Sequence, residues 1–256
     1  METKETGSVS SSDGVPGVED QTGALVRVYV IVGWAALVLL AVVLGLVYRR
    51  VARGRLVYET EGRAVTMAQQ FTATSWPQVR AFTRRAPDLD PDALSEHPET
   101  EALHRDLLAL RERFSVSKLR LYGASGLIVG STDPDEVGRY TDDATVVEMA
   151  AGRWYGNGRP NAHSELIAAD VLVTPETTLR DVDLVVTHVV IRDTSPSNLE
   201  RDVGVLGIYQ DVTPAARRIA RTQALATGIV VAVAMVALVV VWPRPPSLEA
   251  SGSQSA

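Results

Sequence analysis

The 256-residue chain contains no cysteine, only four histidines, and only two lysines, Lys4 and Lys118, among its 25 basic residues. The absence of cysteine excludes disulfide bonds and thiolate metal sites. The histidines are scattered without the spacing of metal ligands, so we expect no metal and no cofactor. Acidic residues outnumber basic ones by 31 to 25, which argues against a nucleic-acid partner.

The sequence also lacks the motifs of the common enzyme classes. It contains no glycine-rich phosphate loop and no H-E-x-x-H zinc motif. The stretch Gly123 to Gly126 reads G-A-S-G, but Leu127 stands where a nucleophile elbow has its second glycine. We therefore expect no enzymatic activity, and in particular no kinase, cyclase or hydrolase activity.

Two long apolar runs are present, Val28 to Tyr48 and Ala224 to Trp242, and neither contains a charged residue. Each is long enough to cross a hydrocarbon core of about 30 Å as a helix. Buried helices of soluble domains seldom stay apolar on every side over such a length. We predict a disordered tail at 1–23, a transmembrane helix at 24–48, a folded domain at 49–222, a second transmembrane helix at 223–242 and a disordered tail at 243–256.

The first part of the central segment predicts helices. Val51 to about Trp76 is compatible with a helix until Pro77 interrupts it, and apolar residues recur at helical spacing from Leu103 to Phe114. Ala144 to Ala151 is a candidate short helix, for which Asp142 or Asp143 is available as the cap.

The remaining signals of the central segment are those of strands. Val116 to Tyr122 and Leu127 to Ser131 predict a hairpin around the G-A-S-G turn. Leu184 to Ile191 and Val203 to Gln210 are rich in β-branched residues and predict two strands that pair antiparallel. Thr213 then caps a helix that begins at Pro214 and runs into the second apolar segment, so the last strand leads directly into it.

Two segments resemble extracytoplasmic PAS-like (Cache) sensor domains of bacterial histidine kinases and diguanylate cyclases. Leu119 to Gly138, LRLYGASGLIVGSTDPDEVG, is similar to their hairpin and S-T-D-P-x-x-hydrophobic-G segment. Val203 to Thr213, VGVLGIYQDVT, is similar to their last strand and its Y-x-D-V-T exit. The resemblance covers Val51 to Trp242 and is vague from Thr141 to Asp181. It implies an α+β fold between two transmembrane helices, with an antiparallel sheet, flanking helices and a small-ligand pocket over one sheet face.

The residues of the two motifs have turn and cap chemistry, which is a structural role. Thr132 or Asp133 can cap a short helix that begins at Pro134 and is closed by Gly138. The full set of predicted structural residues is Ser131, Thr132, Asp133, Pro134, Gly138, Asp211, Thr213 and Pro214.

A pocket over the sheet would use polar residues at strand ends and in the covering loop. His188 shares a strand face with Leu184, Val186 and Val190, and is either a satisfied core histidine or a polar group facing a cavity. An arginine beside aromatic residues suits a carboxylate ligand, although a solvated loop explains the same pattern. The candidate ligand-binding residues are Tyr122, Arg153, Trp154, Tyr155, His188 and Tyr209.

The arginines around the central domain conflict with the resemblance. Those that follow the first apolar run or precede the second are Arg49, Arg50, Arg53, Arg55, Arg217, Arg218 and Arg221. The positive-inside rule, taken literally, puts the central domain in the cytoplasm, but the rule weakens for long translocated segments. We follow the resemblance and expect a two-pass protein of the cell membrane whose central domain is extracytoplasmic.

The resembling proteins normally continue into a kinase or cyclase domain, whereas this chain ends fourteen residues after Trp242. We therefore expect a small-ligand sensor that signals through its second transmembrane helix to a separate partner in a two-component system. The expected partners are an organic anion as ligand, the membrane, and a second copy of the chain or a signalling kinase. Small residues in the second apolar run permit the close helix contact that a dimer would use. The alternatives are a structural membrane protein and a truncated receptor.

Overall fold

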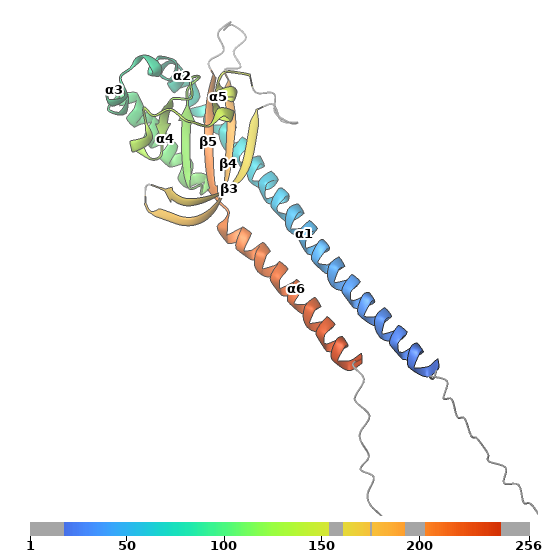
Figure 1. Cartoon of the computed structure of the whole chain (residues 1–256). Helices are drawn as coiled ribbons and strands as arrows, with labels where there is room; N and C mark the ends of the chain where they lie inside the picture. The colour runs from blue at the N-terminus through green and yellow to red at the C-terminus, as the bar shows by residue number, and fades with distance from the viewer. Residues whose placement is uncertain (1–17, 154–160, 175, 193–202, 242–256) are drawn as a thin grey trace, which may run out of the picture. The chain divides into compact units, whose positions relative to one another are not determined.

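The computed structural model describes residues 18–153, 161–174, 176–192 and 203–241. These residues form two units (Figure 1). One unit is residues 49–221, and the other comprises the described residues before and after that segment. The first and last helices, α1 (Val18–Thr74) and α6 (Thr213–Val241), each contribute to both units.

Two helical stretches are long and apolar enough to cross a membrane, Val28–Thr74 in α1 and Thr213–Val236 in α6. Their most apolar windows are not buried within the protein. In the unit that contains them, a Cβ placed on Gly45 of α1 would lie 3.5 Å from Gln223 Nε2 of α6, so the two helices touch there. The prediction of two apolar helices that flank an α+β domain is confirmed at this level.

The central unit is built on one five-stranded antiparallel sheet in the order β2-β1-β5-β4-β3. The last strand in the sequence therefore lies in the middle, paired with β1 on one side and β4 on the other. The strands are β1 (Lys118–Tyr122), β2 (Ile128–Ser131), β3 (Ala162–Val173), β4 (Thr178–Arg192) and β5 (Val203–Asp211).

The first face of the sheet packs against helices and forms the main core. Leu119 and Leu121 of β1 and Leu206 and Ile208 of β5 point to this face and are fully buried. The helices that cover it are the C-terminal part of α1, α2 (Trp76–Arg85) and α4 (Pro98–Phe114). Two shorter elements, η1 (Ala86–Asp88) and α3 (Pro91–Ser95), connect α2 to α4.

Gly130 of β2 explains how closely α4 approaches the sheet. A Cβ at this position would lie 2.4 Å from Leu103 Cδ2 and 2.8 Å from Leu103 Cγ. Any larger residue would push α4 away, because packed interiors have no spare volume of this size.

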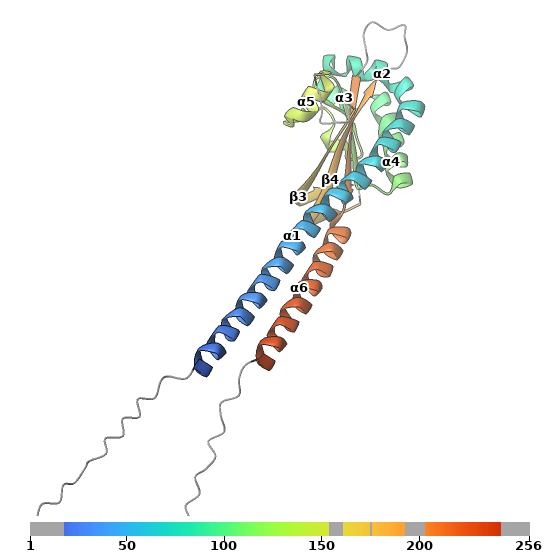
Figure 2. The same cartoon turned by 90° about the vertical axis from the view of Figure 1, so that its right-hand side faces the viewer.

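The second face carries α5 (Ala144–Ala150), and Figure 2 shows α4 and α5 on opposite sides of the sheet. Val146 and Met149 of α5 pack on Val190 and Val205. Of the two predicted caps, Asp142 and Asp143, the cap of α5 is Asp143, whose carboxylate accepts a hydrogen bond from the Thr145 amide at 2.8 Å. The helix ends at Ala150, one residue earlier than expected.

A long β3–β4 hairpin is the main feature that the sequence patterns did not predict. Ala162 to Val173 pairs in register with Thr178 to Val189 of β4, and β4 begins six residues before the predicted Leu184. Asp181 has a positive φ of 50°, which interrupts the regular pairing, and the far half of the hairpin curves away from the sheet (Figure 1). The pattern is weak here because polar and apolar residues do not alternate strictly along β3.

Candidate functional site

The second sheet face gathers the polar side chains of the central strands. Because side chains alternate along a strand, Lys118, Arg120 and Tyr122 of β1 share this face with Tyr209 of β5 and His188 of β4. Lys118, Tyr122, His188 and Tyr209 are buried, with exposed fractions of 2, 1, 4 and 9 %. A polar set this deeply buried is costly unless each member finds a partner.

Two tyrosines and an arginine form the centre of this face. The hydroxyl groups of Tyr122 and Tyr209 lie 3.1 Å apart, and either can donate to the other. Arg120 Nη1 donates to the Tyr209 hydroxyl at 2.7 Å, and its guanidinium lies 4.8 Å from the Tyr209 ring centroid. Burial raises the pKa of Tyr209, and the neighbouring Tyr122 hydroxyl raises it further, so the phenol stays neutral.

His188 is the polar residue whose contacts are incomplete. Its ring meets Tyr122 edge-on at a centroid distance of 6.0 Å. A Cβ on Gly207 would lie 2.9 Å from Tyr122 Cε2 and 3.3 Å from His188 Cδ2, so a glycine is needed there. His188 Nδ1 lies 4.0 Å from Asp143 Oδ2, and Nε2 has no hydrogen-bond partner among the described residues.

The protonation state of His188 follows from this environment. Burial lowers the pKa of His188 to about 4, although the Asp143 carboxylate acts in the opposite direction. The imidazole is therefore neutral near pH 7, with one nitrogen able to donate and the other to accept a hydrogen bond.

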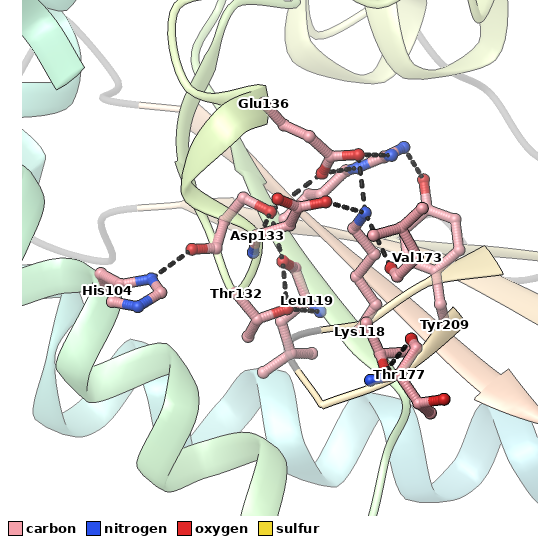
Figure 3. A network of polar contacts seen from close by, with 12 residues as sticks. His104, Lys118, Leu119, Thr132, Asp133, Glu136, Val173, Thr177 and Tyr209 are labelled. Carbon is pink, nitrogen blue, oxygen red and sulfur yellow. Dashed lines mark hydrogen bonds and ion pairs between the residues drawn. The ribbon is translucent and has the colours of Figure 1, made fainter. Parts of the chain in front are cut away.

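A second polar cluster lies at the start of β1 (Figure 3) and centres on the carboxylate of Glu136. Glu136 belongs to η2 (Pro134–Glu136) and accepts hydrogen bonds from Lys118 Nζ at 2.6 Å and from Arg120 Nε at 2.7 Å. Arg120 Nη2 and Ser131 Oγ donate to the same carboxylate, the latter at 3.0 Å. Burial alone would raise the pKa of Glu136, but these hydrogen bonds outweigh it and lower the pKa.

Lys118 connects this cluster to the β3–β4 hairpin. Its ammonium group also donates to Asp133 Oδ2 at 3.1 Å and to the Val173 carbonyl at 3.2 Å. All three hydrogens of the buried Lys118 ammonium group therefore have acceptors. Near the tip of the same hairpin, Glu176 pairs with Arg111 of α4.

The structure corrects the predicted role of Asp133. It occupies the N-cap position of η2, but its side chain makes no capping hydrogen bond and pairs with Lys118. The element is a single 3-10 turn that ends at Glu136. Gly138 has a positive φ of 85°, in agreement with its predicted turn role. Thr132 bonds across the hairpin, since the Leu119 amide donates to its hydroxyl at 3.2 Å.

The junction between the sheet and α6 is held by hydrogen bonds from two strands. The Thr213 amide donates to Asp211 Oδ1 at 2.8 Å, as expected for a turn role of Asp211. The Asp183 amide of β4 donates to the Thr213 hydroxyl at 2.9 Å, and the Val212 amide donates to the Asp183 carbonyl at 2.9 Å. Pro214 follows as the second residue of α6. Thr213 is therefore the first residue of α6 instead of its predicted cap, and its hydroxyl accepts from β4.

Of the predicted ligand-binding residues, three lie together on the second face: Tyr122, His188 and Tyr209. Arg153 is exposed beyond the end of α5, where its amide donates to the Glu148 carbonyl at 2.9 Å. Trp154 and Tyr155 lie outside the described residues. His97 is the N-cap of α4, and His104 Nδ1 is 2.8 Å from the Ser131 carbonyl. Within the described ranges, no group of three or more His, Cys, Asp or Glu side chains is placed to hold a metal ion.

The sequence analysis missed Lys118, Arg120 and Glu136. A signal was available for the first two, because basic residues at alternate positions of a strand otherwise rich in apolar residues point to one face. Glu136 could not be found in this way, since its contact with β1 depends on the turn after β2.

No protein-family model matches the chain. No curated protein matches it either. Among solved structures, the crystal structure of the E. coli DcuS sensor domain is similar, with 12 % sequence identity and a TM-score of 0.40. The similarity covers 67 % of this chain and 98 % of that one.

Proposed function

We propose that this chain is a membrane-anchored sensor that binds a small polar ligand on the second face of its sheet. The observation that carries the proposal is the buried Nε2 of His188, which has no partner among the described residues and lies beside Tyr122. An orphaned buried nitrogen costs free energy that a bound ligand would recover. The adjacent hydroxyls and guanidinium supply the few convergent polar groups typical of a ligand site.

The same residues have a short connection to α6. Arg120 and Tyr122 both contact the hydroxyl of Tyr209, which lies on β5 two residues before Asp211. Asp211 in turn accepts from the amide of Thr213, the first residue of α6. A ligand that moves Tyr209 would therefore shift the first residues of α6, because only a short piece of backbone and the Asp211–Thr213 hydrogen bond lie between them.

A ligand screen on the full-length chain in detergent tests this proposal. Organic acids and amino acids would be added singly, and the thermal midpoint of unfolding measured. A ligand at 100 times its dissociation constant should stabilise the protein by about 2.7 kcal/mol. His188→Leu should abolish the shift, and Glu148→Gln, an exposed control on α5, should leave it unchanged. Absence of a shift with every compound would favour a purely structural role.

We further propose that the apolar stretches of α1 and α6 anchor the chain in the cell membrane with residues 49–221 outside the cytoplasm. Their length and exposure support the anchoring. Alkaline phosphatase and green fluorescent protein fused near residue 160 test the orientation. Phosphatase activity is expected, and cytoplasmic fluorescence alone would reverse the placement.

The change at α6 would be received by a separate signalling protein, such as a kinase, or by a second copy of this chain. Cysteine cross-linking is well suited to this question because the chain has no native cysteine. Single cysteines introduced along residues 224–236 should form cross-links whose yields change when a ligand from the screen is added. Unchanged yields at every position would contradict signalling through α6.

A further inference from the structure

The carboxylate of Glu136 is surrounded by hydrogen-bond donors of the kind that form an anion-binding site. Four donor groups from three side chains converge on its two oxygens. Arg120 binds it through two nitrogens, the paired geometry that arginine uses for carboxylates. Lys118 adds a second positive charge, and Ser131 adds a hydroxyl. A free carboxylate of the same shape would satisfy the same donors.

Apart from the Glu136 carboxylate, the turn is held by its own backbone hydrogen bonds, by the Asp133–Lys118 pair and by the partly buried Val137. None of the three residues of η2 is buried, and Asp133 before it makes no capping hydrogen bond to the turn. The anchors on either side are the Ser131 hydroxyl, which accepts from the Asp133 amide, and Gly138, whose amide donates to the Ile128 carbonyl. Between these anchors, the ion pairs of its carboxylate are the side-chain contacts that fix the position of the Glu136 side chain.

Removal of Glu136 would affect the two cations unequally. Lys118 would keep Asp133 and the Val173 carbonyl as acceptors. Of the hydrogen bonds that Arg120 makes to described residues, only the one to the Tyr209 hydroxyl would remain. Its side chain is 24 % exposed, against 2 % for Lys118, so solvent reaches the arginine first. A carboxylate from solution would thus find both access and an unsatisfied cation.

We infer that Lys118 and Arg120 form a carboxylate-binding site which Glu136 fills when no ligand is present, and which a ligand carboxylate takes over by displacing Glu136. This inference rests on the proposed function and names the chemistry of its ligand. Because an attached group competes at an effective concentration in the millimolar range or above, a simple monocarboxylate binds weakly to the intact site. The effective ligand carries a carboxylate and a second polar group that reaches the Tyr209 and Tyr122 hydroxyls.

The displacement has a defined structural result. The ligand keeps Arg120 paired, so Arg120 stays on Tyr209, while η2 loses the ion pairs of Glu136. The segment released is the turn 134–137, because Lys118 still holds Asp133 and the Gly138 amide still bonds to the Ile128 carbonyl. Ligand binding on β1 thus loosens the turn that follows β2.

Acetate provides a direct test in the full-length chain. Glu136→Ala removes a methylene and a carboxylate from the side chain, and acetate has the size and charge of the group removed. Acetate should raise the thermal midpoint of Glu136→Ala by about 3 °C or more at ten times its dissociation constant, and the effect should saturate. Chloride at equal ionic strength should not do so. Asp135→Ala, which removes an exposed carboxylate from the same turn, should not respond to acetate. Equal responses of the two variants would overturn the inference.

A second measurement on the unmodified chain keeps the test valid if Glu136→Ala fails to fold. High concentrations of acetate, compared with chloride, should accelerate hydrogen exchange of the amides at residues 135–137 and leave those of β5 unchanged. Equal exchange in the two salts would contradict displacement. Neither readout needs the natural ligand, so a positive acetate result beside a failed ligand screen would refute only the proposed sensor function.

Discussion

The two faces of the sheet are built from the same strands but have different contents. Leu119, Leu121 and Leu206 on the first face meet apolar side chains of the covering helices. On the second face, the neighbouring positions on the same strands are Lys118, Arg120 and Tyr209, and the apolar residues there form two smaller clusters. Burial of apolar side chains on the first face stabilises the fold, whereas the buried charges of the second face destabilise it unless they are paired. The second face is therefore where binding chemistry is available.

The largest effect is expected on the first face. Phe71 of α1 is 1 % exposed within the main core. Phe71→Ala should lower the free energy of unfolding by about 4 kcal/mol, through lost burial and a cavity. Chemical denaturation of the full-length chain in detergent measures this. A loss below about 1 kcal/mol would contradict the assignment of this face as the main core.

On the second face, removal of one charge should cost nearly as much. Glu136→Gln leaves Lys118 and Arg120 with one carboxylate fewer, and should destabilise the protein by about 3 kcal/mol. Asp135→Asn on the same turn is the matched control and should change stability by less than about 0.5 kcal/mol. If the two variants were equally stable, the cluster would contribute no more than a surface ion pair.

Acidification should also lower the stability of the protein, through His188 on the second face. The folded-state pKa of His188 is lowered to about 4 from an ordinary value of 6.5, so the unfolded chain binds a proton first as pH falls. Stability contributed by the neutral imidazole is complete above pH 6.5 and is lost as pH falls toward 4, by roughly 3 kcal/mol at most. His188→Gln should flatten the stability profile between these values. An unchanged slope would contradict the burial of a neutral imidazole.

The smallest expected effect distinguishes two roles of Asp143, the capping of α5 and the negative charge beside His188. Asp143→Ala should cost about 1 kcal/mol because the Thr145 amide loses its acceptor. Asp143→Asn keeps that acceptor and should be nearly neutral for stability, yet should lower the pKa of His188 further by removing a nearby negative charge. Denaturation and histidine NMR titration measure the two effects. Equal stability of Asp143→Ala and Asp143→Asn would exclude a capping role.

Local patterns were sufficient for much of the fold. The helix from Pro98 to Phe114, the hairpin around Gly126 and the cap at Asp143 were predictable because each depends on residues close in sequence. The central position of β5 was not, since strand order depends on contacts between distant segments. The β3–β4 hairpin was missed because strict alternation is absent along β3.

The candidate site was predictable only in part for the same reason. Tyr122, His188 and Tyr209 were found because each lies at a definite position of a predicted strand. The pairing of Arg120 with Glu136 joins residues sixteen positions apart through a turn whose geometry no local pattern specifies. Asp133 was assigned to a cap because the buried Lys118 that attracts it could not be anticipated.

The double pairing of β5 restricts how a movement of the sheet can pass to α6. Val205 to Tyr209 are paired with β1, and Val203 to Asp211 are paired with β4. Sliding β5 along its own axis by one residue would break both ladders and send every side chain to the opposite face. Axial translation of the first turn of α6 is therefore far more costly than a rotation or a change of tilt at Val212, where the chain leaves the sheet.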